Sequence, residues 1–190
     1  MFDDLNFSPA ELDAAEKLVG YNLRIPKSAV VKGSRSSWLE TVVVEEAVRE
    51  DKESSSGAAH TVFSMKAKVI PGPVESDNIG RYRTEYLRIN QGALKGRTDT
   101  SGKNSPQNEA QMSAMSLKKL KQIAVAAGLD LSGGLTADVL NVLFPVRDTG
   151  VSVLSGSKLA VTVTNNNAKQ QPNGEDQQEF SAFFVAPTGA

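Results

Sequence analysis

Residues 111–128 carry the clearest hydrophobic pattern in the chain, and this pattern predicts an amphipathic helix. Apolar residues recur there at steps of three and four, which gathers them on one helix face, while lysines fall off that face. Gly128 is a natural end for the helix, because glycine adopts the left-handed conformation without a steric penalty. The predicted apolar face consists of Leu117, Leu120, Ile123, Ala124 and Ala127.

Alternation of apolar and polar residues predicts β-strands on both sides of this helix. It is strictest in residues 61–70, and in residues 81–90 the same period of two places two tyrosines on one face. That face carries Tyr82, Thr84, Tyr86 and Arg88, and the other carries Arg83, Glu85, Leu87 and Ile89. Further strands are predicted for residues 21–25, 38–48, 158–164 and 179–185, the last two as a hairpin.

Two shorter helices are predicted from their capping residues. Residues 8–19 begin Ser-Pro-Ala-Glu, in which Ser8 and Glu11 can form a capping box. Thr136 can cap a second helix, through residue 143, that ends before Pro145. Polar segments between the elements predict flexible loops at about residues 50–59, 92–108 and 165–178.

Length and composition set the class of protein. A long helix among strands must cover one face or one end of a sheet, so the sequence predicts an α+β fold that is mostly β. The chain has 190 residues, 39% of them hydrophobic, and we expect a single domain over residues 1–190. It contains no cysteine, which excludes disulfides and thiolate zinc sites. Its opening Met-Phe-Asp-Asp and the lack of an apolar run of about 20 residues predict a soluble, cytoplasmic protein without membrane contact.

The formal net charge is only −1, but the charges are segregated along the chain. Residues 40–53 hold six acids against two bases, a balance of −4. Residues 81–103 hold six bases against two acids, a balance of +4. The basic block predicts a local field that can bind a polyanion whatever the global charge. The alternative is that both blocks are separate solvated surfaces.

The sequence argues against an enzyme. His60 is the only histidine, so no second histidine can complete a triad or a metal cluster around it. Residues 92–98, Gly-Ala-Leu-Lys-Gly-Arg-Thr, look like a phosphate-binding loop but are one residue short and carry Arg97 where lysine is needed. The carboxylates lack the spacing of a calcium loop or of a paired-acid site. We therefore predict no catalytic residue, no metal and no cofactor.

Basic and aromatic residues interleave on the predicted strands, a composition suited to single-stranded nucleic acid. Such a ligand needs cations for its phosphates and exposed rings on which its bases stack, without strict motif spacing. The candidates are Lys66 and Lys68 on one strand, Tyr82, Tyr86 and Arg88 on the next, and Arg35 and Trp38 at the head of a third. The alternative is that both tyrosines are core residues that pack under the helix.

After these basic and aromatic strands, three further stretches resemble the single-stranded-DNA-binding proteins of phage replication and recombination modules. They are Ala-Ala-Gly at 126–128, Ser-Gly-Ser-Lys-Leu-Ala-Val-Thr-Val-Thr at 155–164 and Glu-Phe-Ser-Ala-Phe-Phe-Val at 179–185. The resemblance covers residues 62–185. It implies an OB-like five-stranded barrel with a helix before the closing hairpin and a groove for single-stranded DNA. Residues 92–108 and 136–143 are additions to a minimal barrel, and the acidic tail of many such proteins is not seen after Glu179.

We therefore predict a non-catalytic protein that binds and protects single-stranded DNA in phage replication or recombination, in the host cell cytoplasm. Replication or recombination proteins are candidate partners, and the sequence is compatible with an oligomer. The main alternative is a phage structural or assembly protein that acts through protein–protein contacts, and a third is an inhibitor that captures a host protein through residues 40–53. The predicted nucleic-acid-binding residues are Arg35, Trp38, Lys66, Lys68, Arg81, Tyr82, Arg83, Tyr86, Arg88, Lys95 and Arg97.

Overall fold

Runs of strands and helices follow one another along the chain in an α+β arrangement that is mostly strand, as predicted. The computed structural model describes residues 5–19, 37–53, 59–90, 92, 106–170 and 176–186. The strands are β1 (Ser37–Glu53), β2 (Ala59–Ile70), β3 (Tyr82–Ile89), β4 (Lys158–Gln170) and β5 (Asp176–Val185). The helices are α1 (Pro9–Val19), α3 (Pro106–Ala126) and α4 (Ala137–Leu143).

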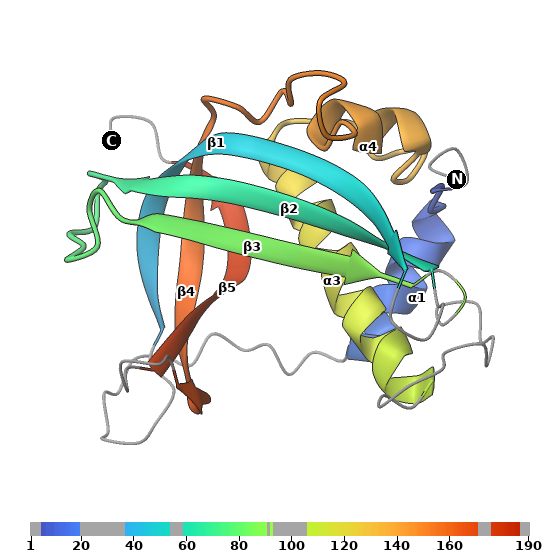
Figure 1. Cartoon of the computed structure of the whole chain (residues 1–190), viewed down its shortest axis with the longest axis horizontal. Helices are drawn as coiled ribbons and strands as arrows, with labels where there is room; N and C mark the ends of the chain where they lie inside the picture. The colour runs from blue at the N-terminus through green and yellow to red at the C-terminus, as the bar shows by residue number, and fades with distance from the viewer. Residues whose placement is uncertain are drawn as a thin grey trace.

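The five strands form one antiparallel sheet in the order β3-β2-β1-β4-β5. The central strand β1 is long enough to serve both sides, because residues 37–43 pair with β4 and residues 41–53 pair with β2. Its register on β2 shifts between Val44 and Glu46, which makes a β-bulge at Glu45. Bulges bend a strand and raise its twist. The sheet accordingly curves, and the β4–β5 hairpin runs steeply across the direction of β2 and β3 (Figure 1).

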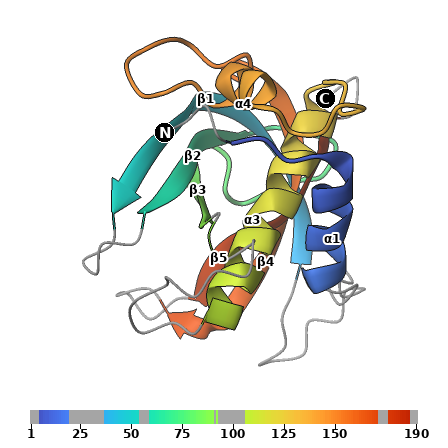
Figure 2. The same cartoon turned by 90° about the vertical axis from the view of Figure 1, so that its right-hand side faces the viewer.

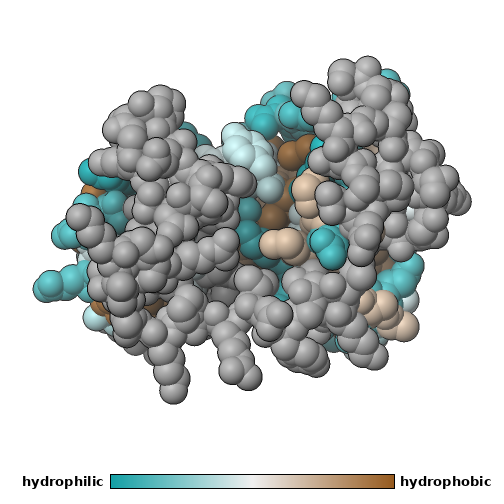
Figure 3. Space-filling view, turned by 90° about the horizontal axis from the view of Figure 1, so that it is seen from below, coloured by the Kyte–Doolittle hydropathy of each residue, from teal (hydrophilic) through white to brown (hydrophobic). Residues whose placement is uncertain are grey.

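Helix α3 lies against the sheet and contacts both of its edge strands, β3 and β5. Figure 2 shows α3 running along the side of the sheet with α1 beside it. Because β3 and β5 remain the two edges, the described residues form an open five-stranded sheet. The prediction was an OB-like five-stranded barrel, and the described residues do not show a closed barrel. Seen from below, apolar atoms of the described residues are visible at the surface (Figure 3).

The core lies between the inner face of the sheet and the helices. Alternate residues of β2 are buried there, as the period of two predicts, and the ring of Phe63 meets Phe144 edge to face at 5.5 Å between centroids. Of the predicted apolar face of α3, four residues are fully buried, and Ala127 packs against the core while partly exposed. The four buried residues are Leu117, Leu120, Ile123 and Ala124.

The predicted caps are confirmed. In α1 the backbone N–H of Ser8 donates to Glu11 at 2.8 Å and the N–H of Glu11 donates to the Ser8 hydroxyl at 3.3 Å, which is a capping box. The N–H of Val139 donates to the side chain of Thr136 at the start of α4. Gly128 ends α3 with φ of 78°, the left-handed conformation expected of a C-cap glycine.

The element boundaries differ from prediction where polar residues are involved. β1 continues to Glu53 and β4 to Gln170, inside segments predicted as loops, and α3 begins at Pro106 rather than at residue 111. The polar end of β1 pairs with β2, and the polar end of β4 pairs with β5. These pairs form through backbone hydrogen bonds, which require no apolar side chain. The predicted strand at 21–25 lies outside the described residues, as does most of the predicted loop at 92–108. No helix in the described part is long and apolar enough to cross a membrane.

Candidate nucleic-acid interface

The outer face of the sheet at β2 and β3 carries every second residue of each strand. Residues that pair directly across an antiparallel ladder project their side chains to the same face. Lys68 pairs with Tyr82, and Ser64 pairs with Tyr86. Lys66 pairs with Thr84 between them. The lysines and tyrosines predicted from separate strands therefore share one surface, on the opposite side from the buried residues of β2.

Both tyrosines on this face are exposed. Tyr82 has 52% and Tyr86 has 69% of its surface accessible. The alternative interpretation, in which both rings pack in the core under the helix, is therefore wrong. An exposed tyrosine ring on a strand offers a flat apolar surface and a polar hydroxyl, a combination enriched at binding interfaces.

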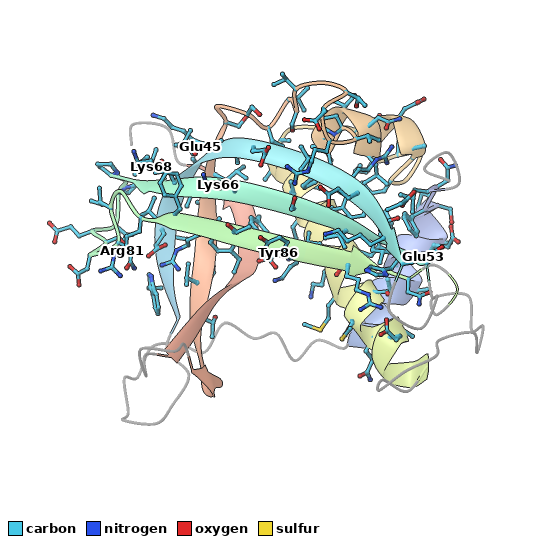
Figure 4. The ribbon with its side chains drawn as sticks, viewed as in Figure 1. Glu45, Glu53, Lys66, Lys68, Arg81 and Tyr86 are labelled. Carbon is cyan, nitrogen blue, oxygen red and sulfur yellow. The ribbon has the colours of Figure 1, made fainter. Side chains whose placement is uncertain are left out.

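The two tyrosines differ in their surroundings. The ammonium group of Lys66 lies 4.5 Å from the centre of the Tyr82 ring, and that of Lys68 lies 5.7 Å from it, within cation–π range. Tyr82 thus holds both lysines over its ring. Tyr86 has no ring contact of this kind with any described residue, so it is the more accessible of the two platforms. Figure 4 shows Lys66 and Lys68 on β2 and Tyr86 on β3.

Further cations extend this face. Arg81 is exposed directly before β3, at the turn, and is labelled there in Figure 4. Arg88 is on the outer face by register but reaches toward α3, with its Nη2 atom 3.5 Å from the Glu109 carboxylate, which offsets its charge. Lys158 is exposed at the start of β4 and pairs with Val43, which pairs with Lys68 on its other side. Lys158 therefore belongs to the same row as Lys68 and Tyr82.

Arg83 and Trp38 lie on the opposite face of the sheet, where alternation predicts Arg83 but where Trp38 was not expected. Arg83 donates two hydrogen bonds to the carboxylate of Glu40, at 2.6 and 2.9 Å, and the indole N–H of Trp38 donates to the same carboxylate at 2.8 Å. Glu40 is buried on the inner face of β1 and also accepts hydrogen bonds from Ser76 and Asn78. This Glu40 cluster anchors the β2–β3 turn to β1, so Arg83 and Trp38 have structural roles.

The Glu40 carboxylate is held in its ionised form. Burial by itself would raise the pKa of Glu40, but the hydrogen bonds from Arg83, Trp38 and Asn78, together with the charge of Arg83, outweigh burial and hold the pKa below its usual value. A buried charge is tolerated only when it is paired and hydrogen-bonded. The cluster meets both conditions.

An acidic border runs along the second half of β1, beside the lysines of β2. Glu46 pairs with Lys66, and the bulged residue Glu45 has its carboxylate 3.8 Å from the same ammonium group. Farther along, Arg147 contacts Glu46 at 3.6 Å and hydrogen-bonds to Glu50. The hydrogen bond from Arg147, followed by that from Lys52, holds the pKa of Glu50 below its usual value, so this carboxylate is ionised at neutral pH.

Three predicted residues, Arg35, Lys95 and Arg97, lie outside the described residues. Sequence reasoning missed Lys158, because its place in the same row as Lys68 depends on the order of the strands in the sheet. It also missed the roles of Glu40, Glu45 and Glu46, which it had grouped as one acidic block. Alternation along the strand could have separated Glu40 from Glu45, since Glu40 shares the parity of the buried Val42 and Val44. Glu46 has this parity too, and only the bulge places it on the outer face.

The remaining chemistry of the described residues is sparse. They contain no group of three or more histidine, cysteine, aspartate or glutamate residues that could hold a metal ion. His60 lies half-buried near the start of β2, at the end of the sheet away from Lys68. Comparison of the chain with protein-family models, with curated proteins and with solved structures found no match.

Proposed function

We propose that this protein binds single-stranded DNA, without catalysis, on the outer face of β2 and β3. The observation that carries the proposal is the pair of exposed rings, Tyr82 and Tyr86, on one face with Lys66 and Lys68. Bases of any sequence stack on aromatic rings, and the adjacent ammonium groups neutralise the phosphates. The same combination suits the protection of single strands in phage replication or recombination, the role implied by the resemblance.

The order of the elements supports an OB-like interpretation of the open sheet. Three consecutive strands, a long helix and a final hairpin follow one another, and β1 pairs with both β2 and β4. OB folds are partly open five-stranded barrels that bind oligonucleotides on the face of strands 2 and 3. The proposed site lies on the equivalent strands, β2 and β3. In this chain α3 contacts both edge strands, β3 and β5.

The first test is a fluorescence-anisotropy titration of a labelled oligothymidine with the full chain. We expect Y86A to weaken binding by about 1–3 kcal/mol, the usual loss for one base stack, and Y86F to retain most of the affinity because the ring remains. Y82A should release Lys66 and Lys68 from the ring they contact, so its effect combines a lost ring with less ordered lysines.

The matched control is V125A, which truncates another exposed apolar residue, on α3. It should leave the affinity unchanged. All variants should keep the circular dichroism spectrum of the parent, because the substituted side chains are exposed. Equal affinities for the parent chain and for Y86A, or no binding of the parent at low salt, would contradict the proposal.

A second candidate function is protein–protein assembly, favoured by a separate apolar patch. Val151 is 84% exposed and Val153 is 53% exposed. The N–H of Val153 donates to the carbonyl of Val142, which adds a third exposed valine to the patch. Light scattering distinguishes the two functions. A fixed oligomer that is unchanged by oligothymidine and is dissociated by V151D/V153D would favour assembly.

A further inference from the structure

The outer face of the sheet is divided into a basic half and an acidic half. Lys66, Lys68 and Tyr86 lie on β2 and β3, and Glu45 lies on the second half of β1, as labelled in Figure 4. Three acids of that half, opposed by Lys52 and Arg147, leave the border negative. These acids are Glu45, Glu46 and Glu50.

The β-bulge concentrates this negative charge beside Lys66. In a bulge, two residues of one strand oppose a single residue of its partner. Here Glu45 and Glu46 together lie opposite Lys66, and both side chains are exposed. Arg147 lies 3.6 Å from Glu46, whereas the carboxylate of Glu45 contacts Lys66 itself at 3.8 Å. Without the bulge only one carboxylate would face the lysine.

The distances of a sheet set what this border does to a nucleic acid. Neighbouring strands are about 4.8 Å apart, so β1 lies about 5 Å from the lysines of β2 and about 10 Å from the tyrosines of β3. In duplex DNA the two phosphate backbones face each other across grooves about 6 Å and about 12 Å wide. A duplex that lies across these strands toward β1, with one backbone on β2 or β3, therefore has the other backbone over β1. A single strand has no second backbone to place there.

We propose that Glu45 and Glu46 make the face selective for single strands, by repelling the second phosphate backbone of a duplex. This inference rests on the proposed function and names the residues that determine its specificity. The repulsion acts on duplexes in particular. A single strand meets only the weaker competition of Glu45 for Lys66, since exposed ion pairs are easily exchanged for a ligand phosphate.

The test compares E45Q/E46Q with the parent chain, using a labelled oligothymidine and a labelled duplex of equal length at the same low salt concentration. We expect affinity for the duplex to rise roughly three- to ten-fold, from relief of charge repulsion at short range. We expect affinity for the single strand to rise less than about two-fold. The ratio of the two affinities is the measured quantity.

A control variant, D13N/D138N, removes the same number of charges from exposed positions on α1 and α4 and should leave the ratio unchanged. The single variant E46Q retains the Glu45–Lys66 contact and should give part of the effect. Suppose that the parent binds the single strand and that E45Q/E46Q raises the affinity for both ligands equally or leaves both affinities unchanged. The inference is then overturned and the proposed function stands. If the parent binds neither ligand, both are overturned.

Discussion

At the scale of single residues, the carboxylate of Glu40 determines which basic side chains are left for a ligand. Glu40 binds Arg83, one of the bases of residues 81–103, on the inner face of the sheet. Lys66 and Lys68 remain over the Tyr82 ring on the outer face. Arg83 and its neighbour Tyr82 differ by one position in a strand, and one position reverses the face. Whether a basic residue belongs to the site therefore depends more on which face of the strand it occupies than on how many charges lie near it in the sequence.

The Glu40 cluster gives a prediction about stability and pH. Glu40→Gln leaves the guanidinium of Arg83 without its ionic partner, which should lower the free energy of unfolding at pH 7 by about 3 kcal/mol. The pKa of Glu40 is lowered in the folded state, so its contribution is complete above the unfolded value of about 4.5 and is lost as the pH falls through the folded value. The difference between parent and variant should therefore shrink below about pH 4.5.

Urea denaturation followed by circular dichroism at pH 7 and at several acidic values measures this difference. Glu75→Gln, at an exposed position in the same turn, is the control and should match the parent throughout. A difference between E40Q and the parent that stays constant down to the acid limit would show that the carboxylate charge is not the source of the stability.

At the scale of elements, two glycines with the same backbone conformation allow a controlled comparison. Gly134 and Gly128 have φ of 87° and 78°. A Cβ atom on Gly134 would lie 2.0 Å from the carbonyl oxygen of Phe7, whose backbone pairs with Leu135, whereas one on Gly128 would meet nothing within 4 Å. The first glycine permits the N-terminal segment to dock, and the second only ends a helix.

We expect G128A to cost about 1 kcal/mol, from the left-handed conformation alone. G134A should cost about 3 kcal/mol or more, because the steric overlap with Phe7 is added to the same conformational cost. Chemical denaturation of both variants checks the comparison. Equal losses would mean that the overlap with the Phe7 carbonyl is relieved at no cost in stability.

The sequence predicts the elements well where they bury a face and poorly where they do not. The buried stripe of α3 and the inner positions of β2 follow from periodicity, because burial imposes the periods of 3.6 and two. The polar ends of β1 and β4 have no such signal, since their strand conformation depends on the partner strand. Alternation likewise predicts which residues of β3 share a face. It does not reveal that Glu45 and Glu46 lie beside Lys66.

At the scale of the whole molecule, the net charge is close to neutral, but one face is basic. Binding of a nucleic acid to that face should depend strongly on the salt concentration. The affinity for a single strand falls with salt by a slope of about −0.7 for each neutralised phosphate, in logarithmic units. K66Q/K68Q should therefore reduce the slope by about 1.4, with the tyrosines left in place. Anisotropy titrations at several salt concentrations measure this slope.

The matched control is K118Q/K121Q, which removes two positive charges from α3. It leaves the formal net charge equal to that of K66Q/K68Q, so a difference between the two variants reports on position alone. If both variants change the slope equally, the ligand responds to overall charge and the outer face of β2 is not its site.

The shared strand β1 also has a consequence for the order in which the protein assembles. Thr41 pairs with Ile70 on one side and with Ala160 on the other, so β1 closes a short loop with β2 and a very long one with β4. Long loops cost more entropy to close and slow the contacts that depend on them. We therefore expect β1, β2 and β3 to associate first, also during synthesis, when they leave the ribosome ahead of α3, α4 and the β4–β5 hairpin. The surface with the tyrosines belongs to this early part, and the last hairpin is added to it afterwards.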